Sequence, residues 1–167
     1  KFGVIMDVEA SRAVRQAEVG APKTMIDRTA DRFGLRPERL AGDTAYGSAE
    51  MLNWLVEERQ IAPHIPVIDK SARRDGTFAR EDFRYNHDSD TYTCPAGKTL
   101  VTSGTLVNDG TTLLYRGSTM DCGTCRFKGQ CCPNTPARKI PRSLHEGARD
   151  LARSLAGTPA FEQSRRE

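Results

Sequence analysis

Two groups of residues in this sequence have types and spacings that could support chemistry. The first centres on one carboxylate, Asp43, in the stretch RLAGDTAYGS at 39–48, where a short apolar strand runs into Gly42 and Ser48 opens a predicted helix. Open α/β sheets hold ligands and metal ions just beyond the carboxyl ends of their strands. Asp43 is therefore a candidate catalytic and metal-binding residue. The alternative is a turn residue, because an Asp side chain can bond the backbone two residues on.

The second group is the cysteines. The first of the five stands in a C-P-x-G turn, and the other four form a C-x2-C-x5-C-C run. A C-x2-C turn lets two thiolates reach one tetrahedral ion, and cysteines from elsewhere can fill the other two corners. We therefore expect a structural zinc site with four ligands, namely Cys94, Cys122, Cys125 and Cys131.

Two alternatives to this zinc site stay open at the level of sequence. Cys132 could replace Cys131 as the fourth ligand; we prefer Cys131 because Pro133 follows Cys132, which could pack instead. The thiols could also be free or could form disulfides. A reducing cytosol disfavours disulfides, and two adjacent cysteines are awkward to pair with each other.

The histidines give weaker signals. His64 lies among apolar residues and is interpreted as a core residue, His87 lies in a polar loop, and His145 lies near a helix start. None has a Cys, Ser or Asp partner at a spacing that suggests a nucleophile. The sequence also contains no Gly-rich phosphate-binding loop.

The elements that position Asp43 follow from the periodicity of the apolar residues. Strands and helices alternate, as in a parallel α/β layer. Pro22 is placed at the first position of its helix, and two prolines restrict the last strand to an edge or a bulge. Strands are predicted at 2–8, 40–43 and 61–68, and helices at 22–33 and 48–59.

The pattern changes at Asp69. From there to about Thr135 short β-prone runs alternate with Gly, Asn and Asp turns, and all five cysteines lie in this part. Helical periodicity returns after Pro141, and Thr158 is a predicted cap of a last helix. We therefore predict a partial α/β core at 1–68, a β-rich insertion at 69–140, and helices that return to the core at 141–167.

Length and composition limit the number of domains and the kinds of partner that the chain can have. The length of 167 residues fits one domain, and the net charge of +3 is compatible with a polyanionic partner without requiring one. No apolar run approaches the ~18 residues of a membrane span, so we expect a cytoplasmic protein with no membrane partner. The chain begins without Met and stops within a helical pattern, so we expect a piece of a longer protein.

Several of these stretches together resemble one known family. The stretch GDTAYGS at 42–48 resembles the D-x-x-Y-(D/G)-S block around the second acidic residue of DDE transposases from bacterial insertion sequences. Residues 4–9 resemble the strand before the first helix of these proteins. The resemblance is to the members of this family that carry a cysteine-rich β insertion. In this sequence it continues at residues 63–66 and 92–97, in the cysteine run and at 142–150.

The resemblance implies an RNase H-like fold, here a partial core, in which Asp, Asp and Glu hold two Mg²⁺ or Mn²⁺ ions. Two such ions activate the attacking water or 3′-hydroxyl and neutralise the leaving oxygen. Asp43 matches the second carboxylate. Asp7 lies on the wrong strand by order, so the first is expected upstream of Lys1. Glu167 is a candidate for the third, although we expect that Glu beyond the chain.

The implied function is DNA cleavage and strand transfer in transposition. The implied partners are the DNA of the element ends and of the target, with a homodimer in the full-length enzyme and a location at the nucleoid. The alternatives are a nuclease of the same fold and a non-catalytic, zinc-stabilised module that binds nucleic acid. With one matched carboxylate, residues 1–167 alone are expected to be inactive.

Overall fold

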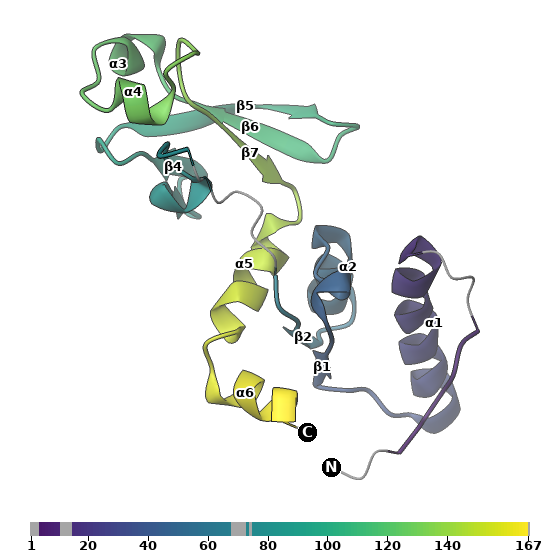
Figure 1. Ribbon diagram of the computed structural model, residues 1–167. Coiled ribbons are helices and arrows are strands. Elements are labelled where there is room, and N and C mark those ends of the chain that lie inside the picture. Colours follow the sequence, from purple (N-terminus) through teal and green to yellow (C-terminus); the bar gives the residue numbers. More distant parts are fainter. Residues whose placement is uncertain (1–3, 11–14, 68–72, 74, 167) are drawn as a thin grey trace. The chain divides into compact units, whose positions relative to one another are not determined.

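The computed structural model describes residues 4–10, 15–67, 73 and 75–166, with only the backbone described at 15–19. The chain is a mixed α/β protein that divides into two compact units (Figure 1). Unit 1 comprises Lys1–Ile68 with His145–Glu167, and unit 2 comprises Asp69–Leu144. The sequence places the second boundary after residue 140, but the strand Lys139–Ser143 belongs to the sheet of unit 2.

Unit 1 is built around a parallel pair of short strands. Strands β1 (Arg39–Ala41) and β2 (Ala62–His64) pair in parallel. Neighbouring parallel strands need a crossover connection. Here the crossover contains three short helical segments, η1 (Thr44–Tyr46), α2 (Ala49–Asn53) and the π-type turn η2 (Trp54–Glu58).

The crossover supplies most of the core of unit 1. The Ser48 hydroxyl accepts a hydrogen bond from the backbone N–H of Met51 at 3.2 Å, which confirms Ser48 as the N-cap of α2. The apolar side chains of these segments face the core, since Met51, Leu52 and Leu55 are fully buried and Val56 is partly buried. They form one cluster with residues from the loops and from the helix that follows unit 2, namely Trp54, Ile61, Ile65, Ala148 and Ala152.

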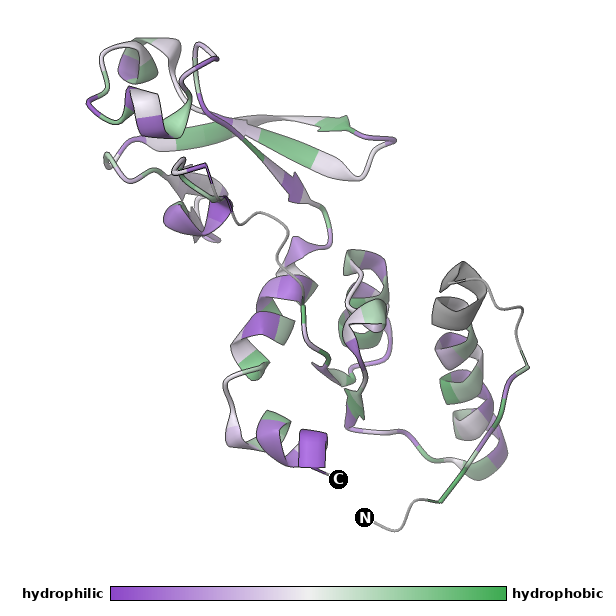
Figure 2. Ribbon diagram, in the orientation of Figure 1, coloured by the Kyte–Doolittle hydropathy of each residue, from purple (hydrophilic) through white to green (hydrophobic). Residues whose placement is uncertain are grey.

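Two helices return to unit 1 at the end of the chain. Helix α5 (Glu146–Leu155) packs against α2 and β2. Helix α6 (Pro159–Arg166) begins after Thr158, whose hydroxyl accepts from the N–H of Phe161 at 3.3 Å, as the sequence predicts. Figure 2 shows that α5 and α6 both carry hydrophobic and hydrophilic residues. Of the predicted apolar face of α5, the alanines are buried, whereas Leu151 is 40% exposed.

The first turn of α5 buries a carboxylate. Glu146 is 1% exposed, and its two oxygens meet Arg149 at 3.3 Å and Arg153 at 2.8 Å. Arg153 also meets Asp150 at 2.6 Å. A carboxylate is costly to bury without cations, so these arginines, which lie on α5 itself, allow Glu146 to be buried in the first turn of the helix.

We expect Glu146→Gln to lower the free energy of unfolding by about 1.5–3 kcal/mol, because it removes the charge of a buried acceptor that bonds Arg149 and Arg153, although Arg153 keeps its pair with Asp150. Thermal or urea denaturation followed by circular dichroism measures this loss. The control is Glu162→Gln, since Glu162 is 52% exposed and lies 4.0 Å from its arginine partner. Equal stability of the two variants would contradict the prediction.

Two predictions near the start of the chain are wrong. Helix α1 spans Arg15–Phe33 and continues through Pro22, which is therefore not its first residue. Residues 4–10 form no strand, and Val4, Ile5 and Val8 are each more than 70% exposed. A strand needs a neighbour for its backbone groups, and the described residues place none beside this segment. Residues 2 and 3 of the predicted strand lie outside the described residues.

Unit 2 is a curled antiparallel sheet in the order β3-β4-β5-β6-β7 (Figure 1). The register of its longest strand shifts between Thr102 and Leu106 around Gly104, at φ +77. Such a bulge bends a strand. The strands are β3 (Arg84–Asn86), β4 (Thr91–Thr93), β5 (Thr99–Val107), β6 (Thr112–Arg116) and β7 (Lys139–Ser143).

Strand β7 is not predicted by the sequence, because Pro141 looks there like the start of the returning helices. The structure places β7 last in the sheet order, so no strand among the described residues pairs with its outer side. A proline is tolerated at an edge, because the N–H that it lacks would have had no partner. Three short helical segments complete unit 2, namely η3 (Arg80–Asp82), α3 (Thr119–Gly123) and α4 (Lys128–Cys131).

The core of unit 2 is small and partly polar. Its buried members are Phe83, Tyr92, Leu100, Tyr115 and Ile140. The hydroxyls of Tyr85 and Tyr115 both donate to one oxygen of Asp90 at 2.6 Å. The Tyr115 and Tyr85 hydrogen bonds lower the pKa of Asp90, and burial raises the pKa of Tyr115.

Candidate functional site

Asp43 lies directly beyond the end of β1, as predicted, with Gly42 between them. Its side chain is exposed, and one oxygen accepts from the backbone N–H of Ala45 at 2.8 Å, which caps η1. The other carboxylate oxygen has no hydrogen-bond partner among the described residues. The turn role is therefore real, and it leaves one oxygen free to bind a ligand.

Glycines on both sides of Asp43 allow the loop to lie close to the end of β2. A Cβ at Gly42 would lie 3.4 Å from Ile65 and from Tyr46. A Cβ at Gly47 would lie 2.9 Å from the carbonyl oxygen of Pro66, closer than real Cβ atoms come to other heavy atoms. The glycines of the 42–48 stretch thus allow the Asp43 turn to lie against the parallel strand pair, because they have no Cβ.

We expect Gly47→Ala to destabilise unit 1 by about 1–3 kcal/mol, because the Pro66 carbonyl belongs to the backbone and must move. Denaturation curves measure the change. Gly147→Ala is the matched control, since a methyl at Gly147 meets no atom within 4 Å. The prediction is contradicted if both variants are as stable as the unchanged chain.

The other carboxylates considered from sequence are not placed in a common site with Asp43. Asp7 pairs with Arg28 at 2.6 Å, and this hydrogen bond lowers the pKa of Asp7. Glu167 lies outside the described residues. Within the part of the chain that is described, no three His, Cys, Asp or Glu side chains converge as metal ligands do.

His64 has a structural role, in line with its interpretation from sequence. It is 5% exposed, and its Nδ1 lies 2.7 Å from the hydroxyl of Ser164. The Ser164 hydroxyl also lies 3.1 Å from the carbonyl oxygen of Ala160, to which it can donate. Burial, and then the charge of Arg39, lower the pKa of His64. The His64–Ser164 contact joins α6 to β2.

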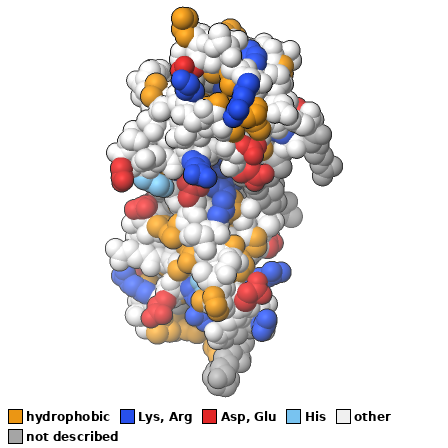
Figure 3. Space-filling model, turned by 90° about the vertical axis from the view of Figure 1, so that its left-hand side faces the viewer, with side chains coloured by type: hydrophobic (Ala, Val, Ile, Leu, Met, Phe, Trp, Pro, Cys, Tyr) orange, Lys and Arg blue, Asp and Glu red, His pale blue; other side chains and the backbone are white. Residues whose placement is uncertain are grey.

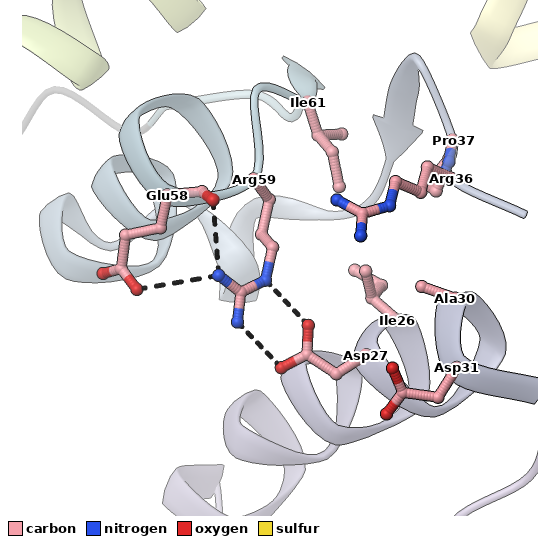
Figure 4. A pocket seen from close by; sticks show the side chains of 9 residues that line it. All are labelled: Ile26, Asp27, Ala30, Asp31, Arg36, Pro37, Glu58, Arg59 and Ile61. Carbon is pink, nitrogen blue, oxygen red and sulfur yellow. Dashed lines mark hydrogen bonds and ion pairs between the residues drawn. The ribbon is translucent and has the colours of Figure 1, made fainter. Parts of the chain in front are cut away.

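A charged cleft of about 350 Å³ lies beside α1 (Figure 4). Arg59 forms a forked pair with Asp27, at 2.7 and 2.9 Å, and its guanidinium lies 4.7 Å from the centre of the Trp54 ring. Asp31 and Arg36 also line this cleft. The Arg59–Asp27 pair spans the cleft between α1 and the end of the crossover, so we interpret the cleft as a structural joint.

The Arg59 hydrogen bond lowers the pKa of Asp27 below its ordinary value of 3.8. The pair therefore stabilises the joint fully above pH 3.8, and this contribution is lost as the pH falls through the lowered pKa. Trp54, the one tryptophan of the chain, reports the change. We expect its fluorescence to change below pH 3.8, and to change less in Asp27→Asn. The same acid transition in both proteins would contradict this.

All five cysteines lie within the described residues of unit 2 and are free, so the disulfide interpretation does not hold. The turn predicted at Cys94 is present. The backbone N–H of Lys98 donates to the Cys94 sulfur at 3.3 Å, and Gly97 permits the turn with φ +76. The other four lie within and just after the short helices α3 and α4.

The five cysteines line one small cavity of about 30 Å³. Burial, and then the thiol of Cys132, raise the pKa of Cys131 to about 11. The pKa of Cys122 is also raised, mainly by burial and partly by Cys132. Cys132 is the most buried of the five, at 6% exposed, and lies beside both. The five cysteines thus share one cavity, and the zinc site expected from their spacing stays a prediction.

The sequence did not reveal the cations of this cavity. Lys128 and Arg138 line it together with the cysteines. The Lys128 ammonium donates to the Cys132 sulfur at 3.5 Å, and Arg138 is 8% exposed. The i, i+4 spacing of Lys128 and Cys132 on α4 was a usable signal. No pattern in the sequence indicated that Arg138 is buried.

Charges of both signs are mixed on the face of the molecule shown in Figure 3, where Lys and Arg side chains lie among Asp and Glu side chains. No helix in the described residues combines the length and the apolar character needed to cross a bilayer.

Comparison of the chain with family models, with curated proteins and with solved structures finds no match.

Proposed function

We propose that this chain is part of a DDE transposase of a bacterial insertion sequence, and that Asp43 is the second of its three metal-binding carboxylates. The observation that carries the proposal is the free oxygen of Asp43 beyond the end of β1, in a parallel pair with a helical crossover. This is the position at which α/β sheets bind ligands. The motif resemblance at 42–48 supports the same assignment.

In this proposal the full-length protein cuts DNA at the element ends and joins them to a target. Asp43 would bind Mg²⁺ or Mn²⁺ through its free oxygen, while its other oxygen keeps the bond to the Ala45 N–H. The bound metals would activate the attacking hydroxyl and stabilise the charge on the leaving oxygen. The first Asp and the Glu would come from other parts of the full-length protein, which would act as a homodimer on DNA.

The test uses Asp43→Asn and Asp43→Ala in the full-length protein. Asn keeps the cap of η1 and should change stability little, whereas Ala should cost about 1 kcal/mol. Both should bind element-end DNA and neither should cut it, because both lack the charge that the metal requires. A DNA cleavage assay in Mg²⁺ and in Mn²⁺ measures this.

Glu50→Gln is the control, because Glu50 is an exposed carboxylate at the start of the neighbouring helix α2, and it should cleave normally. If Asp43→Asn cleaves normally while Asp43→Ala only loses stability, Asp43 is a turn cap and the proposal fails. A nuclease of the same fold would lose cleavage in the same way. Transfer of a 3′-end into target DNA separates the transposase from that nuclease.

A further inference from the structure

We infer that unit 2 binds one zinc ion through the thiolates of Cys94, Cys122, Cys125 and Cys132, with Lys128 and Arg138 as its counter-charges. This inference does not depend on the proposed function. It changes the ligand set expected from sequence, because Cys132 takes the place of Cys131. It also adds two residues that the spacing of the cysteines did not indicate.

The shared cavity is the first observation. Three segments of the chain bring their cysteines to a space of about 30 Å³, large enough for one water-sized body and too small for an organic ligand. Gly117 leaves room at its wall, since a Cβ there would lie 3.1 Å from the Cys122 sulfur. The ligands do not yet converge as in a closed site. Rotation of side chains that already line one cavity would bring them together.

Arg138 is the second and independent observation. Its side chain lines the cavity and is 8% exposed, yet no carboxylate lies within 4.0 Å of it among the described residues. Its terminal nitrogens donate to the carbonyls of Cys131 and Phe78, at 2.9 and 3.0 Å, and its Nε has no partner in the described structure. The guanidinium lies 5.0 Å from the centre of the Phe83 ring, and the charge of Asp82 and the thiols of Cys131 and Cys132 act on it. An anionic group in contact with it would stabilise its buried charge further.

A zinc tetrathiolate supplies that anionic group. Four thiolates and one Zn²⁺ carry a net charge of about −2, which the single charges of Lys128 and Arg138 balance. The Lys128 ammonium already lies 3.5 Å from the Cys132 sulfur and donates to the carbonyls of Thr135 and Pro136. The positive groups of the cavity thus match the charge of the occupied site.

Burial and hydrogen bonding select Cys132 over Cys131. Cys132 is 6% exposed and its sulfur accepts from the Lys128 ammonium, whereas Cys131 is half-buried. Cys94, which lines the same cavity, receives the N–H of Lys98. Hydrogen bonds of this kind stabilise the thiolate form that binds metal.

Metal content of the purified 167-residue chain tests the inference. We expect about one zinc per chain by plasma mass spectrometry, and Co²⁺ substitution should give the intense thiolate-to-cobalt absorption of a tetrathiolate site. Cys131→Ser should keep one zinc, and Cys132→Ser should lose it. Arg138→Gln should keep the four ligands and bind zinc about 10–100-fold more weakly, as loss of an outer-shell partner does.

Thiol labelling of the unchanged chain gives a readout that does not depend on how the variants fold. With zinc bound, one thiol per chain should react with an alkylating agent, and it should map to Cys131. After chelation all five should react. Absence of zinc with five reactive thiols from the start overturns the site. Retention of zinc by Cys132→Ser together with its loss in Cys131→Ser overturns the ligand assignment.

Discussion

Parallel pairing of β1 with β2 is the constraint on which unit 1 depends. Two parallel neighbours cannot be joined by a tight turn, so residues 42–61 must leave one end of the pair and return to the other. That path creates the Asp43 loop at the carboxyl end and the α2 core on one face. The helices that follow unit 2 then pack on this frame, with α5 against α2 and β2 and the His64–Ser164 contact joining α6 to β2.

Unit 2 has short strands, and its apolar core contains few residues. Polar contacts therefore contribute part of its stability. Asp90 accepts from two tyrosines, and Arg142 lies 3.7 Å from the ring centre of Tyr85 and donates to the hydroxyl of Tyr92. These contacts lie among the strands, whereas the cysteines gather around α3 and α4. The two clusters therefore lie in different parts of the unit.

Local chemistry was predictable from the sequence, and long-range contacts were not. Ser48 and Thr158 cap their helices through atoms a few residues away, and the Cys94 turn depends on neighbours at 97 and 98. In contrast, the His64–Ser164 contact joins residues 100 positions apart, which no local pattern encodes. The buried Arg138 was missed for the same reason, because its environment exists only after the chain has folded.

The errors in predicted elements have the same origin. Residues 4–10 have the composition of a strand, but composition cannot supply the neighbouring strand that such a segment requires. Strand β7 shows the opposite case, since its neighbour β6 holds it in the sheet despite Pro141. Pairing partners decide both outcomes, and for β7 that partner lies more than 20 residues away in sequence.

Pro141 also limits the addition of further strands to the sheet of unit 2. Its strand is the last of the order, and at the other end β3 pairs over only three residues. An exposed edge with regular N–H and C=O groups would let a second chain add its own strand. A ring nitrogen at one edge and a short run at the other deprive an incoming strand of a continuous template. The sheet is therefore protected against growth by self-association.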